Sequence, residues 1–277
     1  MSAPQSHLFD GTPRLHYLEW NPRGPQTLIL LHGNSANAWW WEPVAHAIAP
    51  EFRLLALDLR GHGDSEWTRP PAYAPSDYAD DLARFVSHHA LDGAPPIVVG
   101  HSMGGLCVLD FARRHPEAAR AIVAIDVAVT SSRGRDRFLR RLKALPTVTY
   151  PDLETAKARF RLLPDEGGIS RETVHAIAEK SLARTEEGGW TMKFDRESFY
   201  GRDGIPVLET IAALQCPTLL VRAARSKIMT AEAAEQARDS NPNARLVTIP
   251  GAHHHVLLEK PAAVARVIED FAASLTS

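Results

Sequence analysis

The sequence is poor in cysteine and in net charge, and each shortage excludes a class of protein. The two cysteines, Cys107 and Cys216, stand far apart beside apolar runs in a chain of 277 residues. They predict buried free thiols rather than a disulfide framework, which fits a reducing compartment. The formal net charge of −2 provides no basic field for nucleic acid. We therefore expect no nucleic acid partner.

Long apolar runs are also missing. No apolar segment reaches the length of a membrane span, and residues 1–10 lack a basic region followed by an apolar stretch. We expect a cytoplasmic protein without a membrane span. With a hydrophobic content of 44%, the chain can bury a large core as one domain that carries an insertion.

Strand-like and helix-like segments alternate along most of the chain. The strand-like runs are mostly apolar throughout, as expected of parallel strands buried on both faces. The helical patterns between them have lengths suited to crossover connections. This pattern predicts an α/β fold with a mostly parallel, doubly wound sheet. The expected strands cover residues 27–31, 53–57, 97–99, 121–125, 218–221 and 245–249, and the expected helices cover residues 43–49, 76–90, 106–115, 231–238 and 261–275.

Between residues 127 and 206 the alternation stops. Helix-like segments at 136–145, 153–163 and 171–184 follow one another with no convincing strand between them. We interpret 127–206 as a helical cap, or lid, inserted into a core formed by residues 1–126 and 207–277. A set of ordinary peripheral helices is the alternative.

The most informative motif places a serine between glycines where an apolar run ends and an amphipathic helix begins. It reads Gly100-His101-Ser102-Met103-Gly104. A sharp turn from strand to helix strains the backbone of its middle residue and requires small neighbours. The pattern is typical of a nucleophile elbow, which exposes the Ser102 hydroxyl at the top of a sheet. An ordinary turn between a strand and a helix is the alternative.

Four motifs in a fixed order resemble those of the α/β-hydrolases that carry a cap domain. They are Leu31-His32-Gly33-Asn34, the run Asp58-Leu59-Arg60-Gly61-His62-Gly63-Asp64-Ser65, the Ser102 turn and Gly251-Ala252-His253-His254. The resemblance covers nearly the whole chain outside the cap and implies an esterase-like serine hydrolase. We interpret the charges of the second motif as structural, with Arg60 and Asp64 paired locally.

The resemblance implies His254 as the general base. A serine hydroxyl must lose its proton as it attacks, and an imidazole within hydrogen-bond reach can accept that proton. His254 follows the expected strand 245–249, as the catalytic histidine of the family does. The run His253 to His255 also suggests a metal site, but consecutive loop side chains rarely converge on one centre. We expect neither a metal nor a cofactor.

The acid that orients the base departs from the commonest family pattern. Most members carry a carboxylate after the seventh strand, where this chain has Ser226. We favour Asp126, which follows the preceding strand, because the sites of open α/β sheets gather at the carboxyl ends of strands. Some families of this fold take their acid from that position. Glu232 and Asp239 are alternatives, and Asp126 could instead cap the following segment.

The oxyanion of an attacked carbonyl requires two amide donors. Met103, directly after the nucleophile, supplies one of them, and the resemblance implies Asn34 for the other. The cap aromatics that enter the pocket are left open among Phe138, Phe160, Trp190, Phe194 and Phe199. The residues that we expect in the substrate pocket are His32, Gly33, His101, Trp40 and Trp190.

A serine at the elbow excludes the aspartate chemistry of haloalkane dehalogenases and epoxide hydrolases, which the residues 32–34 otherwise resemble. We expect a hydrolase of carboxylic esters or lactones that forms an acyl-enzyme on Ser102. Its partner is then a small, ester-like molecule. Carbon–carbon bond hydrolases, serine perhydrolases, cofactor-free dioxygenases and ligand-sensing receptors of the same fold are alternatives.

Overall fold

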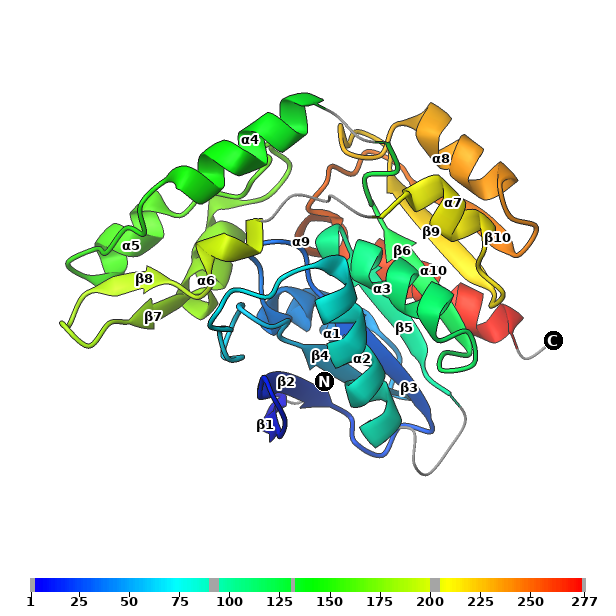
Figure 1. Ribbon diagram of the computed structural model, residues 1–277, viewed down its shortest axis with the longest axis horizontal. Helices are drawn as coiled ribbons and strands as arrows, with labels where there is room; N and C mark the ends of the chain where they lie inside the picture. Colours follow the sequence, from blue (N-terminus) through cyan, green and yellow to red (C-terminus); the bar gives the residue numbers. More distant parts are fainter. Residues whose placement is uncertain (1–2, 90–94, 131–132, 200–204, 276–277) are drawn as a thin grey trace.

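The computed structural model describes residues 3–89, 95–130, 133–199 and 205–275 and is built around an eight-stranded sheet (Figure 1). The strand order is β1-β2-β4-β3-β5-β6-β9-β10. The pairs β1–β2 and β2–β4 are antiparallel, and all other pairs in this sheet are parallel. The predicted mostly parallel α/β sheet is thus confirmed. The strands of the sheet are β1 (Gln5–Phe9), β2 (Leu15–Trp20), β3 (Gln26–Leu31), β4 (Phe52–Leu57), β5 (Ile97–His101), β6 (Ala121–Ile125), β9 (Thr218–Ala223) and β10 (Ala244–Ile249).

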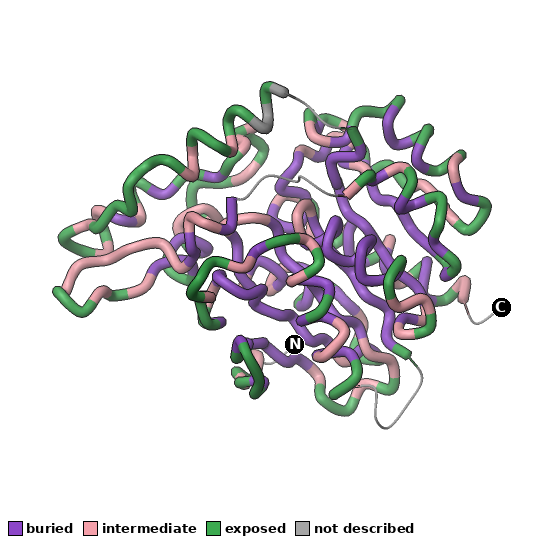
Figure 2. The backbone as a smooth tube through the Cα atoms, in the orientation of Figure 1, coloured by how far each residue is buried: buried purple, intermediate pink, exposed green. Residues whose placement is uncertain are grey.

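Helices cover both faces of the sheet, so successive side chains of an inner strand enter opposite layers. In β3, Ile29 packs in one layer with α2, α3, α7 and α8, whereas Leu28 packs in the other with η1, α1, α9 and α10. Figure 2 shows the buried strands at the centre and exposed residues on the outer helices. These elements are η1 (Ala38–Trp41), α1 (Glu42–Ala47), α2 (Pro75–His89), α3 (Met103–Arg114), α7 (Val207–Ala212), α8 (Ala231–Asp239), α9 (Val256–Glu259) and α10 (Pro261–Ser274). Among the residues described, no helix combines the length and apolar character needed to cross a bilayer.

The strand pattern in the sequence missed β1 and β2. Strand β2 is buried along its whole length although it contains His16 and Glu19. Each of these polar side chains has a partner: His16 binds Asp58, and Glu19 binds Arg53. Burial of polar groups is tolerated when they are paired. Because Asp58 and Arg53 lie far from β2 in the sequence, the local pattern does not reveal this pairing. Ala90, the expected end of the helix 76–90, lies outside the described residues.

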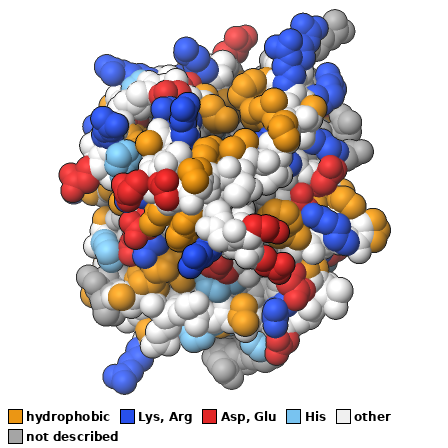
Figure 3. Space-filling model, turned by 90° about the vertical axis from the view of Figure 1, so that its left-hand side faces the viewer, with side chains coloured by type: hydrophobic (Ala, Val, Ile, Leu, Met, Phe, Trp, Pro, Cys, Tyr) orange, Lys and Arg blue, Asp and Glu red, His pale blue; other side chains and the backbone are white. Residues whose placement is uncertain are grey.

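Segment 127–206 lies beside the sheet, with α4 and α5 at the outer edge (Figure 1). Among the described residues, α4, α5 and α6 follow one another with no strand between them, as expected, but β7 and β8 then pair as an antiparallel hairpin. The helix expected to run from 171 to 184 therefore ends early, and the chain enters β7. On the side of the molecule that Figure 3 shows, acidic, basic and apolar side chains are interspersed. The elements of the segment are α4 (Arg133–Ala144), α5 (Leu153–Arg159), α6 (Arg171–Lys180), β7 (Leu182–Arg184), β8 (Trp190–Met192) and η2 (Arg196–Phe199).

The turn at residues 58–65 joins this segment to the sheet. The Asp64 carboxylate binds Lys193 Nζ at 2.7 and 2.9 Å, and the backbone N–H of Gly63 donates to the carbonyl of Lys193 at 2.8 Å. Arg60 instead forms a two-point ion pair with Asp81 on α2, at 2.6 and 2.8 Å. The expected pairing of Arg60 with Asp64 is therefore wrong. Both charges do have structural partners, but these lie on other elements.

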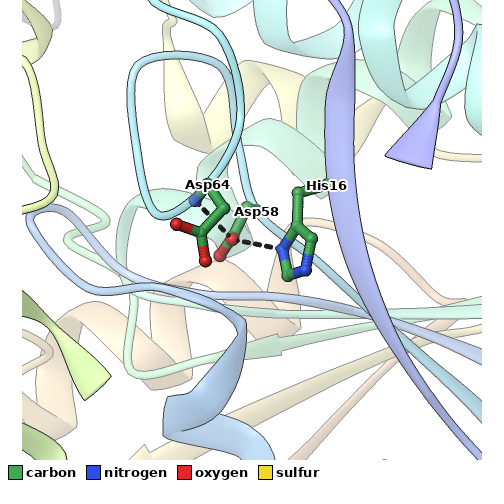
Figure 4. Close-up of side chains that lie close together, drawn as sticks. All are labelled: His16, Asp58 and Asp64. Carbon is green, nitrogen blue, oxygen red and sulfur yellow. Dashed lines mark hydrogen bonds and ion pairs between the residues drawn. The ribbon is translucent and has the colours of Figure 1, made fainter. Parts of the chain in front are cut away.

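The buried Asp58 carboxylate holds the same turn in place (Figure 4). It accepts hydrogen bonds from His16 Nδ1 at 2.7 Å, from the backbone N–H of Asp64 at 2.9 Å and from that of Ala38 at 2.6 Å. Burial by itself raises the pKa of Asp58, but the hydrogen bond and charge of His16, the charge of His32 and the N–H of Asp64 together leave that pKa below its usual value. Suitable ligand atoms of His16, Asp58 and Asp64 lie within 4.8 Å of one another. The ligand atoms of His16 and Asp58 already have hydrogen-bond partners. His16 Nδ1 binds Asp58, and His16 Nε2 binds Ser6 Oγ at 2.8 Å. We assign the cluster to structure.

Replacing Asp58 by alanine should destabilise the protein strongly, because three donors lose a buried acceptor. We expect a loss of about 3–5 kcal/mol in the free energy of unfolding. Asp64→Ala, which removes a carboxylate of the same turn that faces solvent and Lys193, should cost less than about 1 kcal/mol. Urea denaturation followed by circular dichroism checks both values, and equal losses in the two variants would contradict the assignment.

Candidate active site

Ser102 lies at the sharp turn between β5 and α3. Its φ of 53° and ψ of −116° are unusual for a residue with a side chain. The turn is possible because glycines line it: a β-carbon at Gly104 would lie 2.5 Å from the carbonyl oxygen of His32. A β-carbon at Gly100 would likewise collide with the backbone of Gly104. The spacing of small residues thus allows the turn that places the half-buried Ser102 at the cavity.

His254 and Asp126 complete a chain of hydrogen bonds from this hydroxyl into the core. His254 Nε2 lies 3.1 Å from Ser102 Oγ, and His254 Nδ1 lies 2.7 Å from Asp126 Oδ2. His254 is on the loop after β10, and Asp126 directly follows β6. The exposed fraction is 4% for His254 and 0% for Asp126. The structure therefore brings the three side chains together in the order that a serine nucleophile, a base and an orienting acid require.

Ser226 supports the acid from the loop after β9. Its hydroxyl donates to Asp126 Oδ2 at 2.5 Å, and the backbone N–H of Ala223 donates to Oδ1 at 3.1 Å. Burial raises the pKa of Asp126 to about 6, although these two hydrogen bonds lower it. The alternative acids Glu232 and Asp239 are exposed on α8, and Asp239 pairs with Arg238. Asp126 is the carboxylate that binds His254 Nδ1.

The neighbouring histidines make separate contacts. His253 Nδ1 lies 3.1 Å from Glu259, whereas His255 Nε2 donates to the carbonyl of Pro164 at 3.0 Å. His101 donates from Nε2 to the carbonyl of His254 at 2.8 Å, and burial together with the charge of His254 lowers the pKa of His101 to about 3. His101 is thus a neutral ring that holds the His254 loop.

The loop after β3 approaches the serine closely. A β-carbon at Gly33 would lie 3.3 Å from Ser102 Cβ, so glycine allows the following Asn34 to reach the site. His32 shapes this loop: Nε2 accepts the N–H of Leu59 at 3.0 Å, and Nδ1 donates to the carbonyl of Gly33 at 2.7 Å. Asn34 and the first residue of α3, Met103, line the same cavity as Ser102.

The cavity has a volume of about 820 Å³ and lies between the sheet helices and segment 127–206. Its apolar wall from the segment is formed by Phe138, Leu139 and Leu142 of α4, by Leu163 and by Phe199. Of the five cap aromatics left open by the sequence, Phe138 and Phe199 line it. Spacing along α4 was the available signal, because positions 138 and 142 share one helix face.

The expected pocket residues are wrong as a group, since none of the five lines this cavity. His32 and His101 are buried by their own hydrogen bonds, and Gly33 is the site of close backbone approach. Trp40 packs in a small core with Phe160 and Ile177, and Trp190 belongs to the β7–β8 hairpin. The cavity is lined by Asn34, Ser35, Tyr73, Pro75, Tyr78, Ser102, Met103, Leu106, Cys107, Ala128, Val129, Thr130, Gly134, Phe138, Leu139, Leu142, Leu163, Pro164, Ser198, Phe199, Ile205, Pro206, Val207, Leu208, Glu209, Lys227, Ile228 and His254.

With this geometry established, comparison with known proteins identifies the family. A family model of the alpha/beta hydrolase fold matches residues 26–261. The chain belongs to the alpha/beta hydrolase family. The family recognised from four sequence motifs is thus confirmed.

Relatives of this alpha/beta hydrolase match it over most of its length. It is 27% identical to 2-(acetamidomethylene)succinate hydrolase of Mesorhizobium japonicum, over 88% of this chain and 87% of the relative. It is also 27% identical to an esterase of Mycobacterium tuberculosis, over 91% and 84%. A crystal structure of E-2-(acetamidomethylene)succinate hydrolase covers 98% of this chain and 99% of its own, with a TM-score of 0.83 and 26% identity.

Removing the Ser226 hydroxyl should raise the Asp126 pKa further, because a donor to the ionised carboxylate is lost. For Ser226→Ala we expect an increase of about one pH unit, so the carboxylate is protonated at a higher pH than in the wild type. Carbon-13 NMR of the Asp126 carboxyl carbon against pH measures this value. Ser226→Thr keeps a hydroxyl and serves as the control, and an unchanged or lower pKa in Ser226→Ala would contradict the assigned hydrogen bond.

Proposed function

We propose that this alpha/beta hydrolase is a serine esterase that cleaves a carboxylic ester or lactone through an acyl-enzyme on Ser102. The observation that carries this proposal is the hydrogen-bond chain from Ser102 through His254 to the buried Asp126, which opens on a cavity. The esterase among its relatives supports the same reaction class.

In the proposed reaction, Ser102 Oγ attacks the ester carbonyl while His254 Nε2 accepts the hydroxyl proton. Asp126 stabilises the imidazolium that forms and fixes the ring orientation. The tetrahedral intermediate then expels the alcohol, which takes its proton from His254. Water, deprotonated by His254, attacks the acyl-enzyme and releases the acid and the free serine.

The negative charge on the attacked oxygen requires donors that are already in place. We assign this role to the backbone N–H groups of Met103, at the amino end of α3, and of Asn34. A helix amino terminus carries partial positive charge, so the Met103 amide is suited to an oxyanion. Loss of one such donor typically costs about 2.7–4 kcal/mol of transition-state stabilisation.

The cavity supports a substrate with a substantial apolar group. At about 820 Å³ it is large enough for a molecule of drug size. Apart from His254, the charged residues that line it are Glu209 and Lys227, and both are exposed. The apolar part of a small-molecule ester would therefore lie against α4, and the ester carbonyl would lie at Ser102.

A cofactor-free dioxygenase is the second candidate, and the position of the acid favours it. Such dioxygenases resemble this chain in taking their acid from the strand end where Asp126 lies. In that reaction the histidine is the base and the serine binds substrate. Dependence on oxygen separates the two functions.

Ser102→Ala should lower the turnover of nitrophenyl esters at least about a thousandfold, because the nucleophile is lost. Release of nitrophenol from acetate through decanoate esters measures this change. Ser87→Ala removes an exposed hydroxyl of α2 outside the cavity lining and should retain activity within about threefold. Ester turnover that ignores Ser102 would overturn the esterase proposal, and oxygen-dependent turnover retained in Ser102→Ala would favour the dioxygenase.

Phe138→Ala should weaken the preference for long acyl chains, because it removes apolar surface from the α4 wall. We expect kcat/KM for the decanoate ester to fall roughly tenfold while that for acetate stays nearly constant. Leu145→Ala removes an exposed apolar side chain of the same segment outside the cavity lining and is the matched control. Equal losses for acetate and decanoate would place the acyl chain elsewhere.

A further inference from the structure

Glu166 reaches from segment 127–206 to two loops of the core. It lies between α5 and α6. Its Oε2 accepts the backbone N–H of His254 at 2.9 Å, and its Oε1 accepts the backbone N–H of Lys227 at 3.0 Å. One carboxylate of the segment therefore joins the loop after β10 to the loop after β9.

These two loops hold the acid and the base. The residue before Lys227 is Ser226, whose hydroxyl binds Asp126 at 2.5 Å. His254 itself binds both Asp126 and Ser102 through its ring. The two backbone N–H groups that Glu166 accepts thus belong to, or directly follow, the residues whose side chains contact the Asp126 carboxylate.

A second contact fixes the same junction. The His255 ring donates from Nε2 to the carbonyl of Pro164 at 3.0 Å, two residues before Glu166. His255 is buried. Residues 164–166 therefore hold the loop of the base at two points. One is the backbone N–H of His254, and the other is the side chain of the next residue, His255. A carboxylate near the His254 loop also favours positive charge there.

We infer that Glu166 is a positioning residue for the proposed esterase reaction, which sets the orientation of the His254 ring between Ser102 and Asp126. The inference rests on the proposed function. Proton transfer from the serine depends on this orientation, and a displacement of about 1 Å in a catalytic group can cost on the order of a hundredfold in rate. The inserted segment thereby contributes to the acid–base geometry as well as to the cavity wall.

The role requires a carboxylate in particular. Two N–H donors need two acceptor oxygens, and the carboxylate supplies both. In Glu166→Gln one oxygen becomes an NH₂ group, which places a donor against a donor while the side-chain shape stays almost the same. This variant therefore disturbs the junction with little change in packing.

The test compares Glu166→Gln with Asp165→Asn. Asp165 is the exposed neighbour, so its replacement removes the same charge one residue away. For Glu166→Gln we expect kcat on a nitrophenyl ester to fall about 10–100-fold with KM within about threefold, as for a lost hydrogen bond to a charged group. Labelling of Ser102 by a fluorophosphonate should slow by a similar factor. Asp165→Asn should match the wild type within about twofold.

Proton NMR provides a measurement that does not need ester turnover. The low-field resonance of the proton between His254 and Asp126 should shift or broaden in Glu166→Gln and stay unchanged in Asp165→Asn. An unchanged resonance and unchanged kcat in folded Glu166→Gln, or equal effects in the two variants, would overturn the positioning role. Turnover independent of Ser102 in the wild type would overturn the esterase proposal instead, so the two failures are distinguishable.

Discussion

The geometry of the site depends on one buried carboxylate. Asp126 has an exposed fraction of 0%, and its oxygens accept hydrogen bonds from Ala223, Ser226 and His254. A buried charge is costly unless donors surround it, so the loops after β9 and β10 are held where they can supply those donors. The pKa of Asp126, raised to about 6, reflects the part of the burial cost that the donors do not offset. The buried Asp126 thus fixes the position of the His254 ring through the hydrogen bond to Nδ1.

The parallel sheet explains why the acid can follow β6 instead of β9. The two strands are neighbours, with Ile125 opposite Val221, so both end at the same edge. The backbone N–H of Asp126 donates to the carbonyl of Val221 at 2.7 Å, which places the carboxylate beside the loop that usually carries the acid. Ser226 in that loop then changes the role of its position from acceptor to donor. The carboxylate that binds His254 therefore comes from the end of β6, and the hydroxyl that supports it comes from the loop after the neighbouring strand β9.

The parts of the site that could be predicted from the sequence are those that neighbouring residues along the chain determine. Glycines around Ser102 and an acid after an apolar strand are local signals, and the resemblance added His254. The expected pocket residues failed because a position in a motif does not determine which way a side chain points: Trp40 and His32 both turn into packed cores. Strand β2 was missed because its polar residues are buried by distant partners. Glu166 has no local signal, since its partners Lys227 and His254 lie 61 and 88 residues further along the chain.

Segment 127–206 links substrate contact to the acid–base geometry through a very short stretch of chain. Leu163 and Pro164 line the cavity, and Glu166 follows Pro164 by two residues. Both residues whose N–H groups Glu166 accepts, Lys227 and His254, also line that cavity. A substrate group that packs against Leu163 therefore contacts the same loop, between α5 and α6, whose Glu166 binds the backbone N–H of His254. Because packed contacts transmit displacement between neighbouring residues, changes at Leu163 and Pro164 should alter rate as well as specificity, whereas changes at Phe138, on α4, should alter specificity alone.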